Sequence, residues 1–66
     1  MDLTEQQKRL IFHMKRHNMS IDEMTAVLLH LETELKRSNM INYLLHNVPA
    51  TPKEVVDKAI EIGRTF

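Results

Sequence analysis

Cysteine and tryptophan are absent from this chain of 66 residues, which has one glycine and two prolines. Without cysteine no disulfide can reinforce the fold. A core of this size is marginal, so stability must come from close helix packing, a metal or a second copy of the chain. A single glycine also excludes a glycine-rich phosphate-binding loop. These absences favour a small protein that acts by binding.

The chain also has no net charge, because nine Lys and Arg balance nine Asp and Glu. A neutral chain lacks the overall field that draws many proteins to nucleic acid. No apolar run approaches the roughly 18 residues of a membrane span. The opening MDLTEQQKRL lacks the basic start and apolar stretch of a secretory signal. We therefore expect a cytoplasmic protein that makes no use of a membrane.

Apolar residues make up 42% of the chain and charged residues 27%, as in an ordinary globular protein. Three hydroxyl residues, each followed three positions later by Glu or Gln, are typical of helix starts; they are Thr4, Ser20 and Thr51. Alternating strand patterns and hairpin turns are missing. The prediction is an all-α, compact bundle of about four short helices in one domain, residues 1–66, built on a helical hairpin.

The expected helices cover about 5–17, 21–37, 39–47 and 52–62. Lys36 and Arg37 suit a helix C-terminus, Ser38 or Asn39 suits a new start, and Gly63 suits the end of the last helix. Apolar residues at helical spacing predict the core. They are Leu3, Leu10, Ile11, Met14, Ile21, Met24, Val27, Leu28, Leu31, Leu35, Ile41, Leu44, Leu45, Val48, Val55, Val56, Ala59, Ile62 and Phe66, with Met19 and Met40 filling gaps.

The sharpest local feature is a basic face on the first helix that surrounds one aromatic residue. We call it the basic face; it consists of Lys8, Arg9, Phe12, Lys15 and Arg16. Four cations around an exposed ring suit an acidic protein surface or a phosphate backbone. The alternative is an ordinary solvated face with Phe12 folded against a neighbouring helix.

A second off-core surface is predicted on the second helix, at Ala26, Leu29 and His30. Acidic side chains flank it, so the basic face of one copy could meet this surface of another. Burial of Phe12 and Leu29 in a homodimer would add stability to a marginal core.

Four histidines raise the question of a metal site, and His13 and His17 stand four residues apart, on one side of a helix. No cysteine or HExxH motif accompanies them, so we predict no metal and no cofactor. Serines and threonines lack a recognisable nucleophile motif. The chain is therefore predicted not to be an enzyme.

The run LTEQQKRLIFHMKRHNMSIDEMTAVL resembles the opening of helix-turn-helix domains of the LuxR and sigma-factor region 4 kind. The resemblance rests on Leu3, Thr4, Ser20, Glu23, Met24, Thr25 and Leu28. It implies that about 32–44 occupies the recognition-helix position, with Lys36, Arg37 and Asn39 as DNA contacts. However, Leu29, His30 and Leu31 continue the helical pattern, and Glu32 and Glu34 would repel phosphates. The same hairpin is similar to short helical antirepressors of the Sin type, which pair helices with a repressor.

The leading functional hypothesis is a non-enzymatic protein–protein interaction module, a small bacterial or phage regulator or inhibitor that binds its protein partner stoichiometrically through the basic face. One alternative is a dimeric DNA-binding transcriptional regulator. Another is a structural homo-oligomer.

Overall fold

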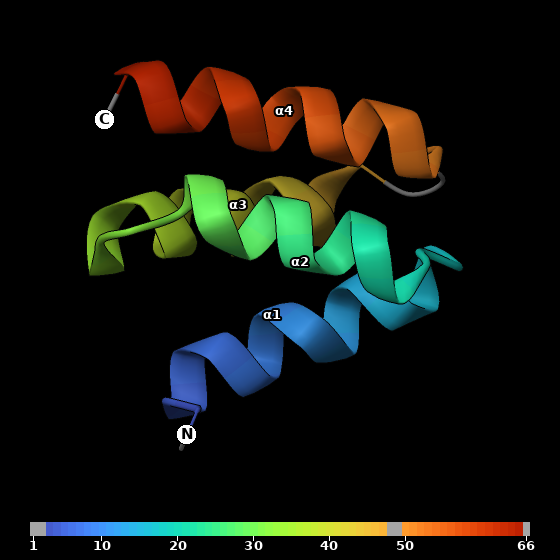
Figure 1. Ribbon diagram of the computed structural model, residues 1–66, viewed down its shortest axis with the longest axis horizontal. Helices are drawn as coiled ribbons and strands as arrows, with labels where there is room; N and C mark the ends of the chain where they lie inside the picture. Colours follow the sequence, from blue (N-terminus) through green and yellow to red (C-terminus); the bar gives the residue numbers. More distant parts are fainter. Residues whose placement is uncertain (1–2, 48–49, 66) are drawn as a thin grey trace.

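The computed structural model describes residues 3–47 and 50–65, and within these ranges the chain is an all-α bundle without strands. The fold class predicted from the sequence is confirmed. Figure 1 shows the helices as α1 (Glu5–Arg16), α2 (Ile21–His30), α3 (Glu34–His46) and α4 (Pro52–Thr65). In the same part of the chain, no helix is long and apolar enough to cross a membrane.

Capping chemistry starts three helices where the sequence predicted. The Thr4 hydroxyl accepts from the Gln7 amide at 3.1 Å, and the Gln7 side chain accepts from the Thr4 amide at 2.9 Å. Ser20 caps α2 in the same reciprocal way, and Thr51 caps α4. Each pair satisfies two backbone donors that a helix start otherwise leaves without partners.

The predicted boundary between the second and third helices is wrong. Helix α2 ends at His30, and α3 begins after Thr33, whose hydroxyl accepts from the Lys36 amide at 3.2 Å. Lys36 and Arg37 therefore lie in the first turn of α3 rather than at the end of a helix. The helix breaks at Leu31, which is buried and has a non-helical backbone conformation (φ −108°, ψ 72°). Tertiary packing of this leucine outweighs the helical pattern that runs through it.

We expect Thr33→Ala to destabilise the protein by about 1 kcal/mol, because the amide of Lys36 loses its capping acceptor. Urea unfolding followed by circular dichroism measures the change. Thr25→Ala is the matched control, because the Thr25 hydroxyl bonds only the Ile21 carbonyl within its own helix. Equal stability of Thr33→Ala and the wild type would show that the cap contributes nothing.

The last helix continues through Gly63 to Thr65, so the predicted end at Gly63 is also wrong. Gly63 instead lies against the C-terminal end of α2. A Cβ atom built on Gly63 would stand 2.8 Å from the carbonyl oxygen of His30. Glycine thus permits a close approach of α4 to the α2 backbone.

Helices that are next but one in the sequence form the main packing pairs. Helices α1 and α3 run in one direction, and α2 and α4 run in the other (Figure 1). Helix α1 packs along α3, α2 packs along α4, α3 also contacts α4, and α1 touches α2 more sparsely. Among the described residues, α1 does not pack on α4, and α2 does not pack directly on α3.

The core lies between all four helices and contains most of the predicted residues. Its buried members are Leu10, Met14, Met19, Val27, Leu31, Met40, Ile41, Leu44, Ala50, Val55, Ala59 and Ile62. Four predicted core residues are instead exposed, namely Leu3, Ile21, Leu35 and Leu45. The shifted start of α3 places Leu35 outside the α2 stripe to which it was assigned. The predictions for Val48 and Phe66 lie outside the described residues.

Candidate functional site

The basic face of α1 is open to solvent, and its aromatic residue does not fold into the core. Phe12 is 58% exposed. The guanidinium carbon of Arg16 lies 5.9 Å from the Phe12 ring centroid, and His13 meets the same ring edge to face at 5.5 Å. This arrangement orients the ring without covering it, which leaves an amphipathic surface of aromatic carbon and positive charge.

The cations of this face are largely without acidic partners in the structure. Lys8 pairs with Glu5 at 3.5 Å, and both side chains are mostly exposed. Within residues 3–47 and 50–65, neither Arg9, Lys15 nor Arg16 has a carboxylate within 4.0 Å. An exposed pair such as Lys8 with Glu5 contributes little stability. The net effect is a concentration of positive charge on one side of a neutral protein.

A groove beside the basic face follows the line where α1 packs on α3. It consists of two hollows of about 230 Å³ each, and Leu45 lines both. We call it the α1–α3 groove. One hollow is lined by Gln6, Arg9, Ser38, Ile41, Asn42 and Leu45, and the other by His13, Arg16, His17, Leu44 and Leu45. Arg9 and Arg16 belong both to this groove and to the basic face.

The two walls of the groove differ in chemistry. Arg9, His13 and Arg16 repeat at helical spacing along α1 and form a basic wall. The α3 wall is polar and aliphatic, and Leu45 on it is 52% exposed. Apolar carbon at the midpoint with cations on either side is typical of a surface that binds a chain carrying both acidic and apolar groups.

The positive charge around the groove affects the pKa of His13. Partial burial lowers the pKa of His13 below its ordinary value, and the neighbouring charges of Arg16 and Arg9 and the proximity of His17 lower it further. Each of these effects opposes a further positive charge at this position. The α1 wall is therefore already crowded with cations in the absence of an anionic partner.

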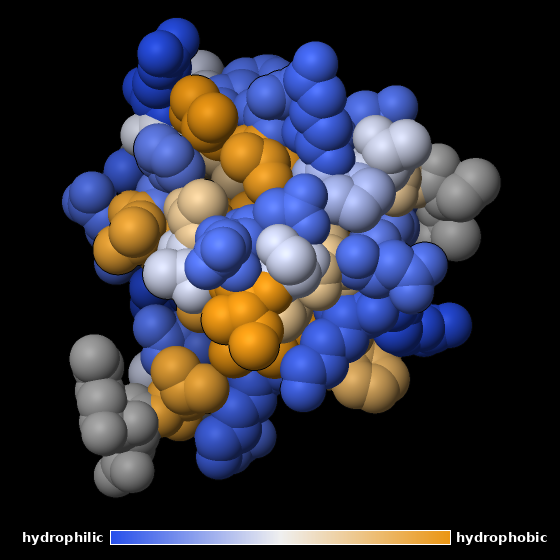
Figure 2. All heavy atoms as spheres, turned by 45° about the vertical axis from the view of Figure 1, so that its right-hand side comes forward, coloured by the Kyte–Doolittle hydropathy of each residue, from blue (hydrophilic) through white to orange (hydrophobic). Residues whose placement is uncertain are grey.

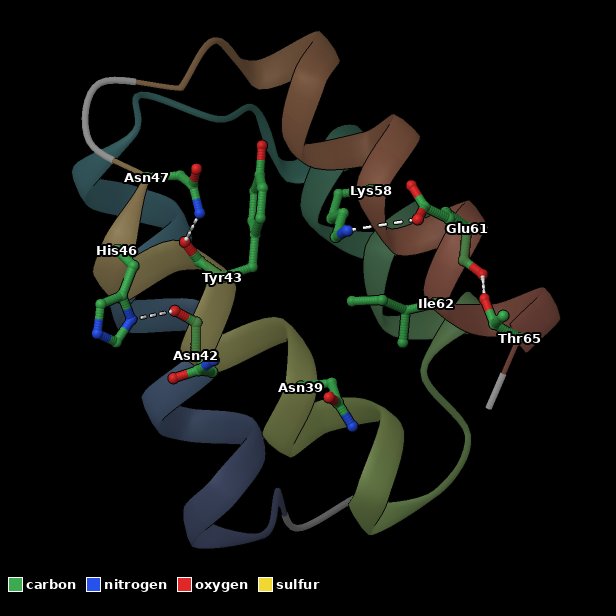
Figure 3. A pocket seen from close by; sticks show the side chains of 9 residues that line it. All are labelled: Asn39, Asn42, Tyr43, His46, Asn47, Lys58, Glu61, Ile62 and Thr65. Carbon is green, nitrogen blue, oxygen red and sulfur yellow. Dashed lines mark hydrogen bonds and ion pairs between the residues drawn. The ribbon is translucent and has the colours of Figure 1, made fainter.

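A second cleft of about 290 Å³ lies between α3 and α4. Figure 3 shows the Tyr43 ring standing between the two helices, where the Lys58 ammonium lies 5.5 Å from its centroid. Most polar groups of the cleft are already engaged. Asn39 donates to Leu35 and Asn47 to Tyr43, both at backbone carbonyls, and Lys58 pairs with Glu61. Because few groups are left to bind a ligand, this cleft is a weaker candidate than the α1–α3 groove.

The predicted self-association residues differ in their exposure to solvent. Leu29 is 72% exposed and lies outside the core, as the sequence predicted. Ala26, by contrast, is half-buried, and the backbone of His30 packs against Gly63. The His30 side chain is exposed, and Ile21 at the start of α2 is a further exposed apolar residue of this helix.

The residues predicted for DNA contact lie in α3 and differ in their hydrogen bonds. Arg37 donates from Nε to the Gln6 side chain at 2.8 Å and from a terminal nitrogen to the Leu31 carbonyl at 3.1 Å. It therefore joins α1, α3 and the segment before α3. Asn39 bonds the Leu35 carbonyl beside the α3–α4 cleft, and Lys36 is half-buried. All three residues are half-buried and lie in the first two turns of α3.

His13 and His17 have different environments despite their spacing. Both residues line the α1–α3 groove. His17 is buried and donates from Nδ1 to the Ala50 carbonyl at 3.0 Å, whereas His13 is half-buried. No group of three or more His, Cys, Asp or Glu side chains suited to a metal is found where the structure describes the chain.

The α3 wall of the groove is the part of the site that sequence reasoning missed. Leu45 was assigned to the core, and Ser38 was assigned to a helix start. Asn42 carried no prediction. A better placed start of α3 would have put Ser38, Asn42 and Leu45 on one stripe, since they recur at intervals of four and three residues.

The surface view of Figure 2 shows several small apolar groups separated by hydrophilic side chains. On that face, apolar contact would have to be combined with polar or charged contact. Comparison of the chain with protein-family models, curated proteins and solved structures gives no significant match.

Proposed function

We propose that the protein is a non-enzymatic interaction module, a small regulator or inhibitor that binds an acidic protein partner through the basic face. The observation that carries the proposal is the exposed Phe12 ring with Arg16 packed over it, beside cations that lack carboxylate partners among the described residues. Aromatic and arginine side chains dominate binding energy at protein interfaces. An acidic partner would neutralise the charge that α1 concentrates.

The mode of action that fits this surface is stoichiometric occlusion. A bundle with principal extents of 27 × 25 × 20 Å can cover a patch of another protein without offering a deep pocket of its own. The three hollows described above, at about 230 to 290 Å³, lie below the usual range of small-molecule sites.

The DNA-binding alternative draws less support from the fold. In a helix-turn-helix the two helices of the motif pack on each other across a short turn. Here α2 and α3 are joined by a short segment but do not pack directly together in the described part of the chain. The internal hydrogen bonds of Arg37 also remove one of the three proposed contacts.

We expect Phe12→Ala to weaken partner binding by more than about 1 kcal/mol, roughly fivefold or more, with the fold unchanged because the ring is exposed. The partner is first identified by cross-linking in the native host, and its affinity is then measured by calorimetry with purified proteins.

The matched control for this experiment is Leu29→Ala, which removes an apolar side chain of comparable exposure from α2. Wild-type affinity of Phe12→Ala, or a larger loss with Leu29→Ala, would place the interface elsewhere. A loss of helical circular dichroism in Phe12→Ala would show that the ring supports the fold.

A further inference from the structure

The α1–α3 groove offers a more specific binding mode than the basic face alone. Arg9 and Arg16 are seven residues apart on α1, which corresponds to about 10 Å along a helix axis. Leu45, on the opposite wall, lines both the hollow that contains Arg9 and the hollow that contains Arg16. An extended chain covers about 10 Å in three residues. The spacing therefore matches an extended segment in which two acidic residues stand three positions apart with an apolar residue between them.

We propose that the α1–α3 groove binds an extended acidic segment of a protein, whose carboxylates contact Arg9 and Arg16 while an apolar side chain between them rests on Leu45. This inference rests on the proposed function and names the part of the partner that is recognised. Charge complementarity selects this occupant, because the α1 wall is cationic and its arginines have no carboxylate partner among the described residues. Arginine also suits carboxylates by geometry, because its guanidinium donates two parallel hydrogen bonds.

The polar residues of the α3 wall complete the site. Ser38 and Asn42 line the hollow that contains Arg9, where a hydroxyl and an amide can bond the backbone of an extended chain. The floor is formed by Ile41 and Leu44, which are buried core residues. Because the floor belongs to the core, the groove is preformed, and binding requires little ordering of the protein.

Binding in this groove is coupled to pH through His13. The charged and titratable groups that lower its pKa are Arg16, Arg9 and His17, all in or next to α1. On α3, the neighbouring lining residues Leu44 and Leu45 carry no charge, and α2 contributes no residue to either hollow. Bound carboxylates would raise the pKa of His13 again, so binding takes up a proton. Affinity therefore increases as the pH falls through the range in which His13 takes up this proton, while glutamate side chains remain ionised.

The test uses a capped peptide of sequence Glu-Glu-Leu-Glu-Glu, titrated into ¹⁵N-labelled protein at low salt and followed by amide NMR shifts. A peptide this short binds weakly, and the titration reaches about 5 mM to detect a millimolar Kd. Supporting results are shifts concentrated along both walls of the groove, an affinity about threefold or more higher at pH 5.5 than at pH 7.5, and loss of that difference in His13→Gln.

Variants separate the groove from the rest of the surface. We expect Arg9→Gln and Arg16→Gln each to weaken peptide binding by about tenfold, and Leu45→Ser to weaken it as well. Lys53→Gln, an exposed cation at the start of α4, is the matched control and should bind as the wild type does. The control peptide Lys-Lys-Leu-Lys-Lys should not bind.

Three results would overturn the groove as the binding site. These are the absence of shifts at the highest concentration, shifts confined to the outer residues Lys8, Phe12 and Lys15, and equal binding of the basic control peptide. Such a failure is distinguishable from failure of the proposed function, because partner binding that depends on Phe12 but not on Leu45 would retain the interaction module and reject only the groove.

Discussion

Replacement of Gly63 by valine should destabilise the protein by about 2 to 3 kcal/mol, because a side chain at this position collides with backbone rather than with a movable side chain. Even a single added carbon would lie 2.8 Å from the His30 carbonyl oxygen. Relief requires α4 to move away from the end of α2, which loosens the packing of Ala59 and Ile62 against the core. For a domain of this size the loss corresponds to a fall in Tm of about 10 to 20 °C.

Thermal unfolding followed by circular dichroism measures this effect, with Arg64→Val as the matched control. Arg64 is the next residue of α4 and is exposed, so this variant places the same β-branched side chain in the same turn without the collision. The expected order of Tm is wild type and Arg64→Val together, with Gly63→Val well below them. Equal melting of the two variants would show that the approach of α4 to His30 is not constrained.

The second large effect is expected at His17. His17→Ala should cost about 2 to 4 kcal/mol, because it opens a cavity and removes the donor to the Ala50 carbonyl at 3.0 Å. This hydrogen bond joins the end of α1 to the residue that precedes the Thr51 cap of α4. Stabilities of small domains are about 0.05 to 0.15 kcal/mol per residue, so the loss is a large part of the total.

Two further variants separate the causes. His17→Leu keeps the volume but not the donor, and we expect a smaller loss of about 1 to 2 kcal/mol. His46→Ala is the control, because His46 is exposed and its Nδ1 bonds the Asn42 carbonyl of its own helix at 2.9 Å. Urea unfolding at pH 7.5 measures the change in the free energy of unfolding for each of the three variants. A change no larger in His17→Ala than in His46→Ala would contradict the structural role of His17.

The helix starts could be predicted where the capping signal had two parts. Thr4, Ser20 and Thr51 are each followed by a side chain that can bond back to the cap. Thr33 was missed because Lys36 stands three residues later, and an ammonium cannot accept a hydrogen bond. Because the start at Thr33 was not predicted, Leu35 was assigned to the second helix instead of the third. The assignment of a residue to a helical face depends on the predicted helix boundaries.

Only the part of the candidate site that lies on a single helix could be predicted from the sequence. The basic face lies entirely on α1, so periodicity alone could bring Lys8, Phe12 and Lys15 to one side. The groove depends on the position of α3 beside α1, which tertiary packing determines. Leu45 is apolar and helical, and nothing in its local sequence distinguishes an exposed groove residue from a core residue.

The pairing of α1 with α3 and of α2 with α4 has a consequence for the order of folding. During synthesis a chain emerges from its N-terminal end, so α1 and α2 leave the ribosome before either has its main packing partner. Neither helix exceeds 12 residues, a length at which isolated helices are marginal in water. The first half of this protein therefore cannot form a stable folding unit alone, and its core closes only after α3 and α4 have been made.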